Sequence, residues 1–97
     1  MAVVLSVLLW ARPGGEQQLF DYEDQVLALL DRHRGRLLSR VRAIDKGPSE
    51  IHLLEFPTEQ ALVDYQNDPN RLALSAMRDQ AIERTEVTRV RHVSAPG

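Results

Sequence analysis

The chain has 97 residues, no cysteine and a formal net charge of −2 at pH 7. This length predicts one domain, residues 1–97, with a single hydrophobic core. The slightly acidic balance argues against nucleic acid or an anionic membrane as the main partner. The absence of cysteine excludes disulfides, thiol nucleophiles and thiolate metal sites, and it fits the reducing cytoplasm in which we expect the protein to reside. Among the 12 basic residues only Lys46 is not an arginine, a bias typical of GC-rich bacterial genomes.

The apolar segment Ala2–Trp10 is the first element of the chain. It is too short to span a bilayer, and it lacks the basic flank and the small-residue cleavage site of a signal peptide. Its run of valine and leucine is typical of a strand that is buried on both faces. We therefore expect a strand from about Val3 to Trp10, ended by the turn cluster Arg12–Gly15.

The segment from about Glu16 to Arg34 has the apolar periodicity of an amphipathic helix. Most of its acidic residues lie in the first half, whereas Arg32, His33 and Arg34 lie in the last turn, as the helix dipole favours. We therefore interpret His33 as a helix C-terminal cation. Gly35 is expected to end this helix in the left-handed conformation.

Two strands are expected next, Arg36–Ile44 and Ile51–Phe56, joined by turn residues at 45–48. We place the turn of this hairpin around Lys46 and Gly47. A slip of one residue in the register would exchange the two faces of both strands.

A second helical region begins at Thr58, a typical N-cap residue. It is expected to break before Pro69, where Asp68 caps a further helical segment that reaches about Ala81. The alternating, β-branched pattern of Thr85–Val93 indicates the last strand.

The predicted order of elements is β-α-β-β-α-β. Right-handed crossovers fold this order into a ferredoxin-like α+β domain, in which one four-stranded antiparallel sheet of strand order 4-1-3-2 carries both helical regions on one face. With the hairpin register given above, the opposite face carries large aliphatic side chains and charges together, namely Leu38, Arg40, Arg42, Ile44, Ile51, Leu53 and Glu55. An apolar patch rimmed by charge is typical of an interface. We therefore expect a homodimer of face-to-face sheets, and the alternative is a monomer with an amphipathic outer face.

Four motifs resemble those of one bacterial family. They are the strand start Gly35–Arg40, the strand-to-helix junction Leu54–Thr58, the helix break Tyr65–Pro69, and Arg78 further along. Together they are similar to domain of unknown function 1330, in the dimeric α+β barrel superfamily. Arg71 stands where members of that family usually carry an aromatic residue, so related branches stay open, such as the antibiotic-biosynthesis monooxygenase-like and stress-responsive barrel proteins. The resemblance implies a dimeric α+β barrel with a ligand cavity, where there is one, between helices and sheet, but no agreed activity.

Arg40 and Glu55 match the strand arginine and strand glutamate of that family. We expect them to form a structural cross-strand ion pair, an interaction that is worth about 0.2–1 kcal/mol on a half-buried face. The alternative is that they orient a substrate carboxylate or hold a proton donor.

His52, Tyr65 and Arg78 are the candidate site residues. We expect them to meet in a cleft between helices and sheet, where Tyr65 and Arg78 bind a small organic molecule with an anionic or carbonyl oxygen and His52 carries a proton. The alternative is that Tyr65 packs at the edge of the core and that Arg78 pairs with Asp79 or Glu83. The spacing of the histidines matches no metal motif, and no phosphate-binding glycine loop is present, so no metal or other cofactor is expected.

Two functional classes remain open. One is a cofactor-independent enzyme or binder of a small metabolite, and the other is a non-catalytic dimeric structural or interaction module. An RNA-binding domain is excluded because the predicted middle strands lack the stacked aromatic residues that such domains use. The sequence decides neither whether the protein is an enzyme nor which ligand it takes.

Overall fold

The computed structural model describes residues 2–96. Its strands and helices, in chain order, are β1 (Val3–Ala11), α1 (Glu16–Leu27), the 3-10 helix η1 (Leu30–His33), β2 (Arg36–Val41), β3 (Glu50–Phe56), α2 (Glu59–Gln66), α3 (Pro69–Leu72), α4 (Ser75–Ala81) and β4 (Ile82–Val90).

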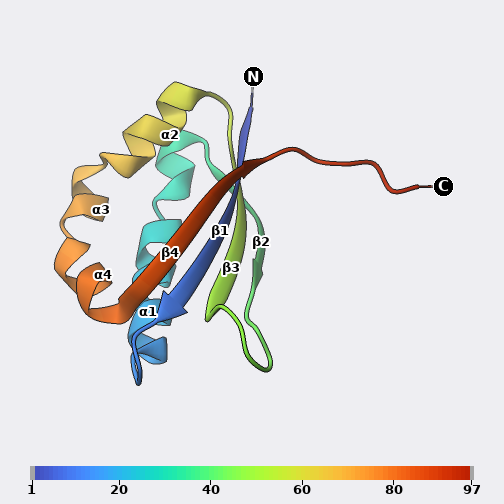
Figure 1. Ribbon diagram of the computed structural model, residues 1–97. Helices are drawn as coiled ribbons and strands as arrows, with labels where there is room; N and C mark the ends of the chain where they lie inside the picture. The colour runs from blue at the N-terminus through green and yellow to red at the C-terminus, as the bar shows by residue number, and fades with distance from the viewer. Residues whose placement is uncertain (1, 97) are drawn as a thin grey trace.

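The strands form one antiparallel sheet in the order β2-β3-β1-β4. This is the strand order predicted from the sequence, and the ferredoxin-like α+β fold is therefore confirmed. Figure 1 shows the helices on one face of the sheet, while the chain after β4 leaves the sheet as an extended tail. None of the helices in the described residues is long and apolar enough to cross a membrane.

The face of the sheet under the helices carries the core. In β3 every second residue is buried on this side, from Glu50 through His52 and Leu54 to Phe56. The opposing side chains of β1 pack beside them, as in the pairs Val3 with Phe56 and Leu5 with Leu54. Because side chains alternate along a strand, Glu50 and His52 are committed to the same buried layer as these apolar residues.

The hairpin of β2 and β3 differs from the predicted register. Arg36 lies opposite Glu55, and Arg40 lies opposite His52, with a bulge between Leu37 and Ser39. Strand β2 ends at Val41, so that an eight-residue connection, and not a tight turn, leads to β3. The prediction that Arg40 and Arg42 lie on the outer face is wrong.

The outer face keeps part of its predicted character. Ile51 and Leu53 of β3 lie there, partly buried, and Val41 lies opposite Ile51. Ile44, in contrast, is almost fully exposed in the connection after β2. Trp10 of β1 lies on this face under the guanidinium of Arg84, 3.9 Å from the ring centre.

The first helical region ends earlier than predicted. Helix α1 stops at Leu27, and the left-handed residue before β2 is Arg34, with a φ of 57°, and not Gly35. Gly35 is needed for a close approach instead, because a Cβ there would lie 2.9 Å from Leu30 Cδ2 and Phe56 Cε1. The glycine therefore lets the start of β2 pack directly against the core.

The second helical region confirms the predicted caps. The hydroxyl of Thr58 accepts a hydrogen bond from the amide of Ala61 at 3.0 Å, and the carboxylate of Asp68 accepts one from the amide of Asn70 at 2.9 Å. Pro69 occupies the first turn of α3, as expected. The segment after it is divided into α3 and α4, and β4 begins at Ile82 and not at Thr85.

Candidate functional site

A cavity of about 140 Å³ lies between the helices and the sheet. Apolar residues of β1, β3, α1 and α2 form most of its wall, and β4 contributes Thr85 and Val87. The polar side chains around it are Tyr22, Glu23, His52, Tyr65, Gln66, Arg71, Arg78 and Thr85. Val87, which is 58% exposed, and the exposed Gln66 mark the mouth of this cavity, beside β4.

The structure brings the three candidate site residues to this one cavity, since His52, Tyr65 and Arg78 all line it. The hydroxyl of Tyr65 donates a hydrogen bond to the carbonyl oxygen of Val26 at 2.9 Å, and burial raises the pKa of Tyr65 to about 12. Tyr65 is therefore a neutral phenol, and its hydroxyl proton is already donated to the carbonyl oxygen of Val26. Arg78 is partly exposed, with Asp79 at 3.7 Å, so its charge remains near the mouth.

The predicted ion pair of Arg40 with Glu55 is not formed within the chain. The two side chains lie on opposite faces of the sheet, because the bulge in β2 places Arg40 on the helix side while Glu55 faces outward. Glu55 lies 3.5 Å from Arg36 instead. Arg40 reaches Asp24 of α1 at 2.7 Å and, in a two-pronged contact, Glu50 of β3.

Glu50 is the centre of a buried network of charges. Arg40 donates to both of its carboxylate oxygens at 2.8 Å, and Arg42 donates to Oε2 at 3.0 Å. Burial alone would raise the pKa of Glu50, but the hydrogen bonds from Arg40, His52 and Arg42 outweigh it and hold the pKa below its usual value. Glu50 is therefore a carboxylate at neutral pH, although it is fully buried.

His52 joins this network to the cavity. Its Nε2 lies 2.6 Å from Glu50 Oε1, so that the ring proton is donated from Nε2 to the carboxylate. Burial lowers the pKa of His52, which is 2% exposed. The imidazole is thus neutral, with the lone pair of Nδ1 free to accept a proton, the arrangement of a general base oriented by a carboxylate.

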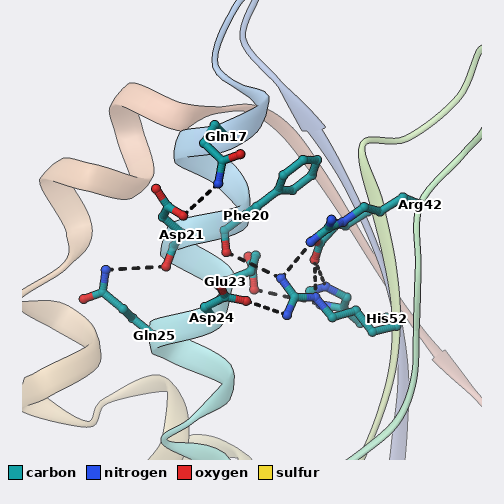
Figure 2. A network of polar contacts seen from close by, with 10 residues as sticks. Gln17, Phe20, Asp21, Glu23, Asp24, Gln25, Arg42 and His52 are labelled. Carbon is teal, nitrogen blue, oxygen red and sulfur yellow. Dashed lines mark hydrogen bonds and ion pairs between the residues drawn. The ribbon is translucent and has the colours of Figure 1, made fainter.

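Glu23 of α1 faces the other ring nitrogen. Its Oε2 lies 3.9 Å from His52 Nδ1, and Figure 2 shows it projecting from α1 toward the sheet. Glu23 is 6% exposed and makes no side-chain hydrogen bond within residues 2–96. Burial and, after it, the negative charge of Glu50 raise the pKa of Glu23 to about 7. At neutral pH this carboxyl group is divided between its acid and base forms.

Two further polar atoms in the wall lack partners. Thr85 Oγ1 and Arg71 Nε are both buried without a hydrogen bond in the described part of the chain. An unsatisfied buried polar group costs about 1–3 kcal/mol, and because both side chains line the cavity, a small turn of either would bring its polar atom to an oxygen atom of a ligand. Among the same residues, 2–96, no three acidic or histidine side chains are arranged to hold a metal ion.

His33 lies outside this cavity. Its Nε2 is 2.8 Å from the carboxylate of Asp68, the cap of α3, and its ring contacts that of Tyr65 edge-on. This contact connects η1 to the start of α3. His33 is therefore a structural residue with one defined partner, whereas the sequence predicted only a cation at the C-terminus of a helix.

The sequence carried signals for both acidic residues that we did not predict. Glu50 precedes His52, Leu54 and Phe56 at a spacing of two, so it shares their face. Glu23 follows Leu19 by four residues in a helix, and therefore lies on the apolar stripe of that helix. A charge that interrupts an apolar pattern in this way is a candidate functional group.

No family model matches the sequence, and no curated protein matches it either. Solved structures do share its fold. A protein of unknown function from Rhodopseudomonas palustris superposes with a TM-score of 0.78 at 16% identity, covering 97% of this chain and 84% of that one. A NIPSNAP family protein from Agrobacterium tumefaciens gives 0.76 at 14%, covering 96% and 94%. A dimeric protein of unknown function and ferredoxin-like fold from Bacteroides fragilis gives 0.71 at 12%, covering 94% and 96%.

These likenesses establish the fold alone. The chain resembles NIPSNAP-like and ferredoxin-like proteins in structure. The narrower resemblance to domain of unknown function 1330 is not confirmed, because no family model matches.

Proposed function

We propose that the cavity binds a small organic molecule with an anionic or carbonyl oxygen, and that His52 exchanges a proton with it. The observation that carries this proposal is the hydrogen bond from His52 to Glu50, which connects the buried carboxylate to a residue in the wall of the cavity. A fully charged, buried carboxylate fixes the tautomer of a neutral imidazole whose second nitrogen faces the cavity beside Glu23. Burying charges costs desolvation energy, and a network of this kind beside an open cavity therefore favours a functional role.

The size and lining of the cavity support a small ligand. A dry cavity of about 150 Å³ holds a molecule the size of benzene, and this cavity measures about 140 Å³. Arg71 and Arg78 supply positive charge near its mouth, and most of the remaining wall is apolar. The open cavity also favours this function over that of a solid, non-catalytic module, for which the helix–sheet layer would be closed by side chains.

The proposal is tested by hydrogen exchange in a bound ligand. In D₂O, the wild-type protein is expected to bind oxo acids of about four to six carbons and to speed the replacement of their α-hydrogens by deuterium, measured by proton NMR. His52→Asn is expected to keep binding but to lose at least about 10²-fold in exchange, since general base catalysis contributes about 10²–10⁴-fold. His92→Asn, which changes an exposed histidine of the tail, is the matched control. If no oxo acid binds, or if His52→Asn exchanges as fast as wild type, the proposal is wrong.

We also propose that the protein is a homodimer, a dimeric α+β barrel, formed through the outer face of the sheet. Ile51, Leu53 and Val41 give this face an apolar centre, and none of the helices of residues 2–96 covers it (Figure 1). The structural neighbour from Bacteroides fragilis is described as dimeric. A stable dimer would bury about 1,200–2,000 Å² in total.

Light scattering measures this assembly directly. The expected mass at micromolar concentration is twice the chain mass of 11.0 kDa. Leu53→Asp is expected to return the mass to that of one chain, because it buries an unpaired charge in the interface. Val63→Asp, on the exposed side of α2, is expected to leave the dimer intact. A wild-type mass of one chain would overturn the proposal.

A further inference from the structure

The proposed function assigns no role to Glu23, the second ionisable group beside His52 in the wall of the cavity. Glu23 is almost fully buried, lines the cavity and has its Oε2 3.9 Å from His52 Nδ1. It makes no side-chain hydrogen bond within the described chain, residues 2–96. A buried carboxyl group that faces an open space and a base, and nothing else that would satisfy it, is placed to act on a ligand.

We propose that Glu23 and His52 form an acid–base pair that catalyses a 1,3-proton shift in small oxo acids, the interconversion of ketone and enol. This inference rests on the proposed function, and it adds to it the reaction and the class of substrate. Glu50 is a positioning residue in this reaction, because it touches His52 and not the ligand.

The step is balanced without a co-reactant. His52 Nδ1 takes the hydrogen from the carbon next to the ketone, and the electron pair of that C–H bond forms the new C=C bond. The electrons of the C=O π bond move to oxygen, which takes the proton of Glu23. The products are the enol, imidazolium and carboxylate. The same step in reverse converts enol to ketone.

The arrangement of the two groups suits this shift. The α-carbon and the ketone oxygen are two bonds apart, and one edge of the substrate therefore presents both to neighbouring acid and base groups. Glu23 and His52 are neighbours of that kind, projecting toward each other from α1 and β3 (Figure 2). After the product leaves, the proton on His52 Nδ1 returns to Glu23 through a water molecule that enters the cavity, because 3.9 Å separates the two atoms, and the site is restored.

The carboxylate of an oxo acid also has partners in the wall. Arg71 Nε and Thr85 Oγ1 are the two buried polar atoms without partners in the described residues, and both side chains line the cavity together with Arg78. An arginine and a hydroxyl are donors suited to a carboxylate. A carboxylate held near the mouth directs the ketone toward His52 and Glu23, deeper in the cavity.

The charges around Glu23 keep it available as an acid. Glu50 and His52 lie near it on β3, Arg40 on β2, Tyr65 on α2, Arg71 on α3 and Arg78 on α4. Burial and Glu50 outweigh the three arginines and raise the pKa of Glu23 to about 7, whereas burial lowers the pKa of His52. An acid and a neutral base therefore exist together near neutral pH, as the reaction needs.

The experiment measures the rate at which enol becomes ketone. Oxaloacetic acid is added as its enol to the purified protein, and the decay of the enol absorbance is followed from pH 5 to pH 9. The variants are Glu23→Gln, Glu23→Asp and, as a matched control on the surface, Glu83→Gln. Wild type is expected to speed the decay, and Glu23→Gln to lose at least about 10²-fold in kcat with little change in KM. Glu23→Asp is expected to recover part of the rate, and Glu83→Gln to behave as wild type.

The outcomes separate the two proposals. If His52→Asn abolishes deuterium exchange while Glu23→Gln keeps the wild-type rate and pH profile, the role of Glu23 is overturned and the proposed function stands. If neither substitution changes a rate, both are overturned. A wild-type protein that does not speed the enol decay overturns the reaction proposed here.

Discussion

Glu50→Gln is expected to destabilise the fold by about 3 kcal/mol or more, because removing one member of a buried ion pair costs about 3–5 kcal/mol. The amide has nearly the shape of the carboxylate, so that the change removes charge without leaving a hole. Arg40 then keeps only Asp24 as a counter-ion, and His52 loses the charge that orients its ring. Urea unfolding at pH 7 measures the loss.

The matched control for Glu50 is Glu59→Gln. Glu59 also pairs with an arginine, Arg89, but both side chains are more than half exposed. Pairs of this kind contribute about 0–1 kcal/mol, and the substitution is expected to cost no more. If the two variants lost the same free energy of unfolding, burial would not be the reason for the stabilising effect of the Glu50 ion pair.

Lowering the pH of the wild-type protein should remove the same stabilising contribution of ionised Glu50. The pKa of Glu50 is held below its usual value in the folded protein, so its stabilising effect is present above the unfolded value of 4.5 and is lost as pH falls through the folded value. The Glu50→Gln variant lacks this part of the acid dependence. Adding Arg40→Gln to Glu50→Gln should cost less than the sum of the single changes, because the two side chains contact each other.

Glu23→Gln is expected to have the opposite effect and to stabilise the fold at alkaline pH. The pKa of Glu23 is about 7 in the folded protein, against an ordinary 4.5. A shift of this size corresponds to a penalty of about 3 kcal/mol once the group is ionised. The folded state binds the extra proton between these two values, so the wild type loses stability as pH rises from 4.5 to 7. The glutamine variant avoids that loss.

Urea unfolding of both proteins from pH 5 to pH 9 tests this prediction. The difference in the free energy of unfolding should be small near pH 5 and reach its full size above pH 7. His52, whose lowered pKa makes it favour folding as pH rises, is present in both proteins and leaves the difference curve largely unchanged. A pH-independent difference would contradict the raised pKa of Glu23. A gain in stability on removing this group is the mark of a residue kept for activity.

The fold was predictable because its signals are local. Thr58 and Asp68 cap helices in the chain as their side chains suggest, and the right-handed crossover rule then leaves one strand order. The position of Arg40 was not predictable in this way. One extra residue in β2, near Leu38, sets which face Arg40 occupies, and nothing in the local sequence marks that bulge.

The candidate site was predicted in part for the same reason. His52, Tyr65 and Arg78 line one cavity, and the sequence could place them on its side because each lies on an element whose helix-facing side could be inferred. Glu50 and Glu23 were not predicted, since acidic residues are interpreted by default as solvated. Their role depends on contacts that α1 makes with β2 and β3, and on the bulge in β2 that brings Arg40 to Glu50.

The position of the cavity mouth beside β4 has a consequence for kinetics. Val87 and Gln66 stand at the mouth as exposed side chains, and exposed side chains change rotamer in picoseconds to nanoseconds. A ligand of the proposed kind would therefore enter without separation of the helices from the sheet, which would take microseconds or longer. Release of product should not limit turnover, and water reaches the cavity as readily as the ligand does. Chemistry at this site would therefore take place with water at hand, which suits a proton transfer because water can carry protons between the cavity and the solvent.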